Sequence, residues 1–214
     1  MKRGERLKKI EAIDIYPVTC QALSNGRSNL EVLDAVLTGG AKIIQLREKN
    51  WDKKDLYTLA LEFRRRMAPF KAILIINDHV DVALAAGADG VHVGQQDLPV
   101  AAARKIAPDL IIGASSHNIE QAHTAEADGA DYINIGPIFP TNTKKLSVPV
   151  LGPAAIAEIG PKLGVPFTIM GGITADNLKT VVAAGARRVA MVSAITGAAD
   201  ISGRIQKLRR IITG

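Results

Sequence analysis

The chain has 214 residues, of which 47% are hydrophobic, 22% are charged and only 4% are aromatic, and its formal net charge is +6 at pH 7. This balance predicts one sizeable domain with a core of Ala, Val, Ile and Leu. It argues against a β-sandwich and against a nucleic-acid binder that stacks bases on aromatic rings. The single cysteine, Cys20, excludes an internal disulfide and a cysteine-based metal cluster.

Both ends of the chain are basic. The clusters are Lys2, Arg3, Arg6, Lys8 and Lys9 at the front and Arg204, Lys207, Arg209 and Arg210 at the back. No apolar segment of the signal-peptide kind follows the first cluster, and no apolar run approaches the roughly 20 residues of a membrane span. We therefore predict a cytoplasmic protein that does not bind membranes. Its basic termini are expected to be solvated, with residues 1–13 forming an extension or a helix.

Eight short apolar runs are predicted strands. In chain order they are residues 15–20, 42–46, 72–76, 90–93, 110–115, 132–135, 167–170 and 188–192. Most of these runs are continuous rather than alternating, which is typical of parallel strands buried on both faces.

Eight helical patterns alternate with these strands, at residues 30–37, 55–66, 81–86, 100–106, 120–127, 153–159, 175–184 and 201–212. A strand–helix–strand order demands parallel pairing with right-handed crossovers. Eight such units in about 200 residues predict an α/β fold, a single (β/α)₈ TIM barrel over residues 1–214. The main alternative is an open, doubly wound sheet.

A Gly-Ala pair precedes every second predicted strand. The pairs begin at Gly40, Gly87, Gly129 and Gly185, and each glycine suits the left-handed residue that ends a helix. Two strand–helix units repeated four times are expected of a closed barrel, whereas the edge strands of an open sheet should break such a pattern.

Polar residues follow the strands, at the end where the active sites of such barrels lie. Arg47 and Lys49 come after the second strand, two residues apart, so an extended chain would project them to the same side. Arg offers a planar fork to phosphate oxygens and Lys a mobile point charge. The alternative is a solvated surface cluster.

Two carboxylates follow neighbouring strands. Asn77 and Asp78 end the third strand, and Asp97 lies just beyond the fourth. Oxygen ligands of this kind suit Mg²⁺, which usually keeps waters and substrate phosphates in its shell. Each aspartate alone could instead be a helix N-cap.

The later strands end in small polar residues. Ser115 could donate to a phosphate oxygen or, like Asn118, cap the next helix. Glycines and small residues after the last two strands, around Gly172 and Ser193, let backbone N–H groups approach an anion. The four histidines show no tight ligand spacing, and nucleophile-elbow, GxGxxG and Walker motifs are absent.

These residues together predict a site for two anionic groups without a covalent nucleophile. Arg47, Lys49 and one or both of Lys144 and Lys145 supply the cations, and a separate glycine-rich phosphate site lies across the barrel mouth. Such a site favours chemistry in which a diphosphate leaves with metal help while the enzyme neutralises charge and positions the reactants.

Six motifs then stand out together: QLREK at 45–49, INDHVDVALAAGADGVHVGQQDLP at 76–99, IGASSH at 112–117, GADYINIGPIFPTNTKK at 129–145, GGIT at 171–174 and VAMVSAI at 189–195. In combination they resemble the thiamine-phosphate synthase family, and the similarity covers nearly the whole chain. Its most specific parts are the NDxVDxA…GxHxGQxD pair and the GPIxPTxTK loop.

The resemblance implies a (β/α)₈ barrel. It also implies Mg²⁺-dependent joining of 4-amino-5-hydroxymethyl-2-methylpyrimidine diphosphate to a thiazole phosphate, giving thiamine monophosphate and pyrophosphate. Matched motif by motif, the residues for the pyrimidine diphosphate are Gln45, Leu46, Arg47, Glu48, Lys49, Asn77, Ser115 and Lys144. Those for the thiazole phosphate are Thr141, Asn142, Thr143, Gly172, Val192 and Ser193. Asp78 and Asp97 would bind Mg²⁺, and the candidate catalytic side chains are Arg47, Lys49, Ser115 and Lys144.

The chain departs from the family pattern at Leu146, where an Asp is usual, and at Met170, which adds bulk near the thiazole region. Two alternatives are a thiazole tautomerase of the same fold and a catalytically silent phosphate-binding barrel. The intact PTxTK loop argues against the first, and the complete set of cations and carboxylates argues against the second. The predicted partners are small-molecule substrates, with no nucleic acid, and the sequence leaves open whether the chain forms a homo-oligomer.

Overall fold

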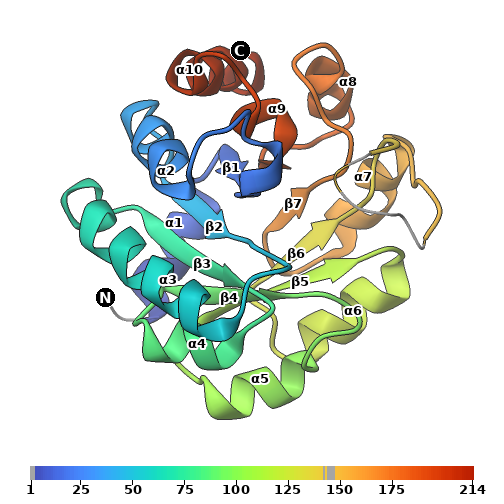
Figure 1. The fold of residues 1–214 in the computed structure, drawn as a ribbon. Coiled ribbons are helices and arrows are strands. Elements are labelled where there is room, and N and C mark those ends of the chain that lie inside the picture. Colours follow the sequence, from blue (N-terminus) through green and yellow to red (C-terminus); the bar gives the residue numbers. More distant parts are fainter. Residues whose placement is uncertain (1–2, 142, 144–147) are drawn as a thin grey trace.

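The computed structural model describes residues 3–141, 143 and 148–214. Within them the chain forms one sheet of parallel strands surrounded by helices (Figure 1). The strands are β1 (Ile15–Pro17), β2 (Ile43–Leu46), β3 (Ile73–Asn77), β4 (Gly90–Val93), β5 (Ile111–Ser116), β6 (Tyr132–Ile135), β7 (Phe167–Ile169) and β8 (Val189–Met191). Their order in the sheet is β1-β8-β7-β6-β5-β4-β3-β2.

Contacts just beyond β1 close this sheet into a barrel. Val18 forms a parallel bridge with Gln45 of β2, and the Thr19 N–H donates to the Gln45 carbonyl at 2.9 Å. The first and second strands therefore meet, and the predicted (β/α)₈ barrel is confirmed over the open doubly wound sheet.

The helices lie between the strands in the predicted order (Figure 1). They are α1 (Arg3–Glu11), α2 (Asn29–Thr38), α3 (Lys53–Met67), α4 (Val80–Ala85), α5 (Val100–Ile106), α6 (Ile119–Ala127), α7 (Ala154–Ile159), α8 (Leu178–Ala183), α9 (Ser193–Thr196) and α10 (Ile201–Thr213). Short 3₁₀ turns lie at Gln21–Leu23 (η1), Ala68–Phe70 (η2) and Gly160–Lys162 (η3). Capping residues set several helix starts: the Ser28 hydroxyl and the Glu31 carboxylate form a capping box at α2, and Asn118 caps α6.

Alternation along the strands divides the core into two layers. Ile43, Ile73 and Ile75 belong to the group of buried residues that fills the barrel interior, whereas Ile44 and Leu74 pack in the layer between strands and helices. Both faces of β2 and β3 therefore carry buried apolar residues, which explains why these strands read as continuous runs rather than alternations.

The first helix covers the barrel at the end where the strands begin. Ile10 of α1 is fully buried with the interior group, and α1 lies behind the strands in Figure 1. Arg3 forms an ion pair with Asp131 at 2.5 Å, and Arg6 lies 3.3 Å from Asp89. The prediction of solvated termini is therefore wrong for these arginines, because α1 docks them onto buried carboxylates.

The Gly-Ala repeat has the backbone conformation that its sequence predicts. Gly40, Gly87, Gly129 and Gly185 all have positive φ, between 63° and 106°. The residue after the pair extends the repeat in two cases. An aspartate follows the second and third pairs, and its carboxylate accepts a backbone N–H from the preceding strand in the chain. Asp89 accepts from Leu74 and Asp131 from Ile112.

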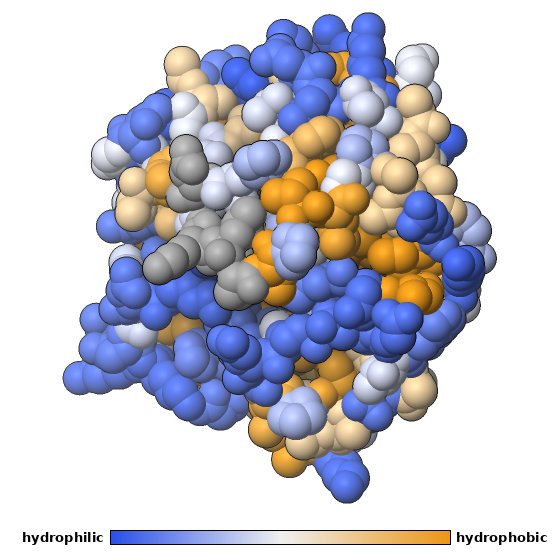
Figure 2. Space-filling view, turned by 90° about the vertical axis from the view of Figure 1, so that its right-hand side faces the viewer, coloured by the Kyte–Doolittle hydropathy of each residue, from blue (hydrophilic) through white to orange (hydrophobic). Residues whose placement is uncertain are grey.

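No helix in the described ranges is long and apolar enough to cross a membrane. Figure 2 shows the side of the barrel that lies to the right in Figure 1, where patches of hydrophobic residues lie among broad hydrophilic areas. On that side the surface is therefore of mixed polarity rather than uniformly charged.

We predict that Asp131→Ala lowers the free energy of unfolding by about 3 kcal/mol, because it leaves Arg104 and the Ile112 N–H without their buried partner. Urea denaturation measures the loss. The control is Asp34→Ala, which removes a carboxylate that is 53% exposed and pairs with Arg66, so it should cost about 0.5 kcal/mol. Equal losses in the two variants would contradict a special role for the buried carboxylate.

Candidate active site

A pocket of about 210 Å³ opens where the strands end. Its lining comes from seven strands and the segments after them: Gln45, Arg47, Lys49, Asn77, Asp78, His92, Gly94, Asp97, Ser115, His117, Asn134, Gly136, Pro137, Thr141, Thr143, Met170, Gly171, Gly172, Ile173, Thr174, Ala190, Met191, Val192, Ser193 and Ala194. Residues that are far apart in sequence thus meet at the one end of the barrel where the sequence analysis expected a site.

The side chains at the end of β2 and just after it point alternately into the pocket and away from it. Gln45, Arg47 and Lys49 line the pocket, as the spacing predicts, whereas Leu46 is fully buried in the layer between strands and helices. Glu48 also points elsewhere: its carboxylate accepts the Gln21 backbone N–H at 2.8 Å. Burial raises the pKa of Glu48, and this N–H opposes the rise. The side chains of Leu46 and Glu48 therefore face away from the pocket, unlike those of the other three residues of this motif.

The two aspartates converge, as their places after neighbouring strands predict. Asp78 has a φ of 62°, held by its N–H donating to the His92 carbonyl at 2.8 Å, and its carboxylate pairs with Lys49. The Asp97 carboxylate accepts the Gly94 N–H at 2.7 Å and shares a hydrogen bond with Asp78. The left-handed backbone at Asp78 is what turns its side chain toward Asp97.

The electrostatics of this pair follow from their shared hydrogen bond. Burial raises the pKa of Asp78, and the neighbouring Asp97 adds to the rise while Lys49 opposes it. Burial also acts to raise the pKa of Asp97, but the hydrogen bonds from Asp78 and from the Gly94 N–H hold that pKa below its ordinary value. Two carboxyl groups held this close together provide oxygen ligands that suit a hard divalent cation once both are ionised.

Within the part of the chain that the structure describes, no group of three or more His, Cys, Asp or Glu side chains could hold a metal. Asp78 and Asp97 could therefore provide only part of a coordination shell. That composition fits Mg²⁺, which is commonly bound by one or two carboxylates with waters and substrate phosphates completing the shell.

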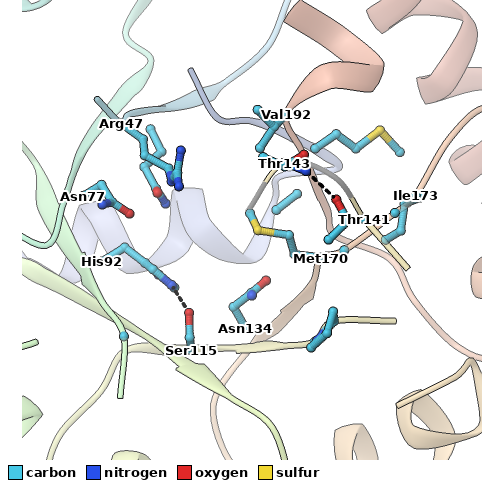
Figure 3. Close-up of a pocket in the computed structure, with 18 of the residues that line it drawn as sticks. Arg47, Asn77, His92, Ser115, Asn134, Thr141, Thr143, Met170, Ile173 and Val192 are labelled. Atoms are coloured by element: carbon cyan, nitrogen blue, oxygen red, sulfur yellow. Dashed lines mark hydrogen bonds between the residues drawn. The ribbon is translucent and has the colours of Figure 1, made fainter. Parts of the chain in front are cut away.

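Histidines contribute to the pocket although their spacing in the sequence predicts no metal site. His92 lies on the inward face of β4, and its Nε2 is 2.9 Å from the Ser115 Oγ (Figure 3). His117 Nδ1 lies 2.5 Å from the Gly136 carbonyl oxygen, at the start of the segment after β6. The signal that could have found His92 is a polar residue at an interior position of a buried strand.

The segment after β6 lies across the pocket from the cations. Thr141 and Thr143 line the pocket, and the Thr143 N–H donates to the Thr141 hydroxyl oxygen at 3.2 Å. In Figure 3, Arg47 and Asn77 lie on one side and these threonines on the other, with Met170 between them. The predicted site residues Asn142 and Lys144 lie outside the described residues.

The glycines after β7 allow close packing of two segments. Gly171 and Gly172 have φ values of 107° and 61°, and a Cβ on Gly172 would lie 2.2 Å from the Pro140 carbonyl oxygen. The Phe139 N–H also donates to the Gly171 carbonyl at 3.0 Å. These glycines therefore seat the segment that carries the threonines, besides presenting backbone to the pocket.

An apolar wall completes the pocket. Met170 and Ile173 after β7 and Met191 and Val192 at the end of β8 all line it, and Ser193 begins α9 beside them. Met170, which the sequence marked as a departure, thus forms part of the apolar wall between the two polar sides.

The fold and this arrangement define an eight-stranded α/β-barrel enzyme whose pocket combines cations, carboxylates and backbone-rich turns for anionic substrates. The sequence model of the thiamine monophosphate synthase family matches residues 15–195. The chain therefore belongs to that family, and its activity is that of a thiamine-phosphate synthase, a transferase.

Curated relatives agree over nearly the full length. The thiamine-phosphate synthase of Caldicellulosiruptor saccharolyticus is 44% identical over 213 residues, covering 99% of this chain and 96% of the relative. That of Methanospirillum hungatei is 43% identical over 194 residues, covering 90% and 94%.

Solved structures agree with the fold. Thiamine phosphate pyrophosphorylase from Pyrococcus furiosus superposes with a TM-score of 0.87 at 35% identity, covering 95% of this chain and 97% of that one. A 3-hexulose-6-phosphate synthase has a TM-score of 0.70 at 22% identity, covering 94% of this chain and 100% of that one, and shares the fold alone.

We predict that Gly172→Ala lowers the free energy of unfolding by about 3 kcal/mol, because the added methyl group meets the Pro140 carbonyl as well as straining the backbone. The matched control is Gly152→Ala, where φ is 75° but no atom lies within 4 Å of the new Cβ. It should cost only the backbone term of about 1 kcal/mol. Chemical denaturation compares them, and a Gly152→Ala loss as large as that of Gly172→Ala would refute the packing role.

Proposed function

We propose that this enzyme joins 4-amino-5-hydroxymethyl-2-methylpyrimidine diphosphate to a thiazole phosphate, with Mg²⁺, and releases thiamine monophosphate and pyrophosphate. The single observation that carries the proposal is the division of the pocket. Arg47 lies on one side and Thr141 and Thr143 lie on the other (Figure 3). Lys49, two residues after Arg47, pairs with Asp78, which lies beside Asp97. Two anionic groups can thus bind at once with an apolar wall between them.

The diphosphate belongs on the side of Arg47 and Lys49. The Arg47 guanidinium can bind phosphate oxygens through two N–H groups at once, and Lys49 can follow the charge as it develops on the leaving group. Asn77 and Ser115 add neutral donors beside them, and Lys144 is proposed as a further cation from the segment after β6.

Asp78 and Asp97 are the proposed Mg²⁺ ligands. Their convergence and their small number suit an ion that takes its remaining ligands from water and the diphosphate. When bound, Mg²⁺ neutralises negative charge on the diphosphate and so makes it a better leaving group. Lys49, which pairs with Asp78 in this structure, would then be free to bind the diphosphate.

The thiazole phosphate belongs on the opposite side. Thr141 and Thr143 supply hydroxyls, and Asn142 is proposed to join them. Gly172, Val192 and Ser193 supply exposed backbone at the ends of β7 and β8, where barrel enzymes commonly bind a substrate phosphate. The apolar wall that includes Met170 would then hold the two rings face to face.

The reaction requires no nucleophile from the protein. The C–O bond to the diphosphate breaks with both electrons leaving on oxygen, and the electron-poor pyrimidine methylene is captured by the thiazole nitrogen lone pair. The protein's part is to stabilise the leaving charge and to hold the two rings in line. We also propose that the enzyme acts in the cytoplasm, where its phosphorylated substrates would be kept.

A coupled assay tests the proposal directly. Purified protein with both substrates and Mg²⁺ should form thiamine monophosphate, read as thiochrome fluorescence after oxidation. Failure to form product, together with isomerisation of a thiazole phosphate, would favour the tautomerase alternative instead.

We predict that Asp78→Ala and Asp97→Ala each lower Mg²⁺-dependent product formation by orders of magnitude while the fold survives, because each removes half of the proposed protein ligands. Initial rates across a Mg²⁺ titration measure the effect. Asp81→Ala is the control, since that carboxylate is 60% exposed and pairs with Lys53 outside the pocket. A near-full rate in either pocket variant would refute the metal assignment.

We predict that Lys144→Ala reduces kcat/KM far more than Lys145→Ala, because the first lysine after the TxT motif is proposed to reach the diphosphate. The two variants remove the same charge from adjacent positions and so serve as each other's control. Equal losses in steady-state kinetics would show that the register is wrong.

A further inference from the structure

A continuous chain of hydrogen bonds passes through the barrel interior beneath the pocket. The Gln45 amide donates to the Tyr16 hydroxyl oxygen at 2.9 Å, and the Tyr16 and Tyr132 hydroxyls are 2.9 Å apart. The Tyr132 hydroxyl lies 3.0 Å from His92 Nδ1, and His92 Nε2 lies 2.9 Å from the Ser115 Oγ. The chain therefore joins two pocket side chains, Gln45 and Ser115, through three residues that are each at most 6% exposed.

With the Gln45 amide as the donor at one end, the bonds along this chain can all run in one direction. Because Tyr16 accepts from Gln45, its own proton is available for Tyr132. Tyr132 then directs its proton to His92 Nδ1, so this nitrogen carries none and Nε2 carries the ring proton. In this order His92 donates to the Ser115 Oγ, 2.9 Å from its Nε2, and the Ser115 hydroxyl proton is left for the pocket.

Both tyrosines remain neutral donors in this setting. Burial raises the pKa of the Tyr16 hydroxyl and raises that of Tyr132 well above its ordinary value. The opposite order would begin with the Gln45 amide turned over, so that Tyr16 donated to its carbonyl. Each later bond would then reverse, and Ser115 would donate to His92 instead of to a ligand.

We propose that Tyr16, Tyr132 and His92 are positioning residues that hold His92 as its Nε2–H tautomer and thereby make the Ser115 hydroxyl a hydrogen-bond donor to the substrate. The same chain ties the orientation of the Gln45 amide to the role of Ser115 on another strand. The inference rests on the proposed function only in naming the pyrimidine diphosphate as the acceptor, since the tautomer itself is a property of the free enzyme.

Nitrogen NMR of the histidine-labelled full chain tests the tautomer without any substrate. The His92 signals, assigned by their loss in His92→Gln, should show an unprotonated Nδ1 and a protonated Nε2. In Tyr132→Phe the donor to Nδ1 is gone, so the preference should weaken. Tyr57→Phe, which changes a half-exposed tyrosine on α3, should leave the signals unchanged. A protonated Nδ1 in the unaltered enzyme would overturn the proposal.

Kinetics of two His92 variants test whether the donor to Ser115 matters. A glutamine side chain can place an N–H near the position of Nε2, whereas an asparagine reaches only the position of Nδ1. We expect His92→Gln to retain most of kcat/KM, and His92→Asn to lose about tenfold, like Ser115→Ala. Equal losses in His92→Gln and His92→Asn would show that His92 contributes only packing, and would overturn its proposed role as a donor to Ser115.

A double-mutant cycle completes the test. If Tyr132 acts through Ser115, Tyr132→Phe should lower kcat/KM in the unaltered background but add no further loss to Ser115→Ala. Fully additive losses would overturn the coupling. Should the enzyme form no product from the proposed substrates, the proposed function fails, while the NMR result still decides the tautomer.

Discussion

The site depends first on the closure of the sheet into a barrel by contacts between β1 and β2, which stand at the two ends of the strand order. The backbone hydrogen bond from Thr19 to the Gln45 carbonyl helps to join β1 to β2, and the Thr19 hydroxyl also accepts the Arg47 N–H at 2.8 Å. Without this contact, β2 would be an edge strand, and its cations would stand far from the glycine-rich ends of β7 and β8. With it, the C-terminal ends of the strands lie together at one end of the barrel. The alternation of side chains along each strand then determines which of them face inward.

Much of this arrangement follows from the sequence because its signals are local and periodic. Continuous apolar runs, Gly-Ala pairs with positive φ and polar residues after each strand suffice to predict the barrel and the end that carries the site. Arg47 and Lys49 share a face because they are two residues apart, and Asp78 meets Asp97 because their strands are neighbours. The resemblance of six motifs to one family then supplies the substrates, which spacing alone cannot name.

What escaped prediction depends on tertiary contacts. Leu46 and Glu48 belong to a matching motif, yet the pleat turns their side chains outward, and the carboxylate meets a backbone N–H of η1. The basic N-terminus reads as solvated because the sequence gives no sign that Asp89 and Asp131 lie beneath it. The spacing of the histidines predicts no role for His92, and only the geometry shows that it connects buried tyrosines to Ser115. In each case the partner lies too far along the chain for periodicity to reveal it.

The buried carboxylates at the opposite end of the barrel carry a consequence for the enzyme's response to ionic strength. Asp131 is 2% exposed and Arg104 is 19% exposed, so dissolved ions can hardly come between them. Substrate phosphates in the open pocket, by contrast, compete with every anion in solution. Salt should therefore lower the affinity for ligands at concentrations that leave the stability of the barrel unchanged. The Coulomb attraction between opposite charges is protected from dissolved ions at the buried end and open to them in the pocket.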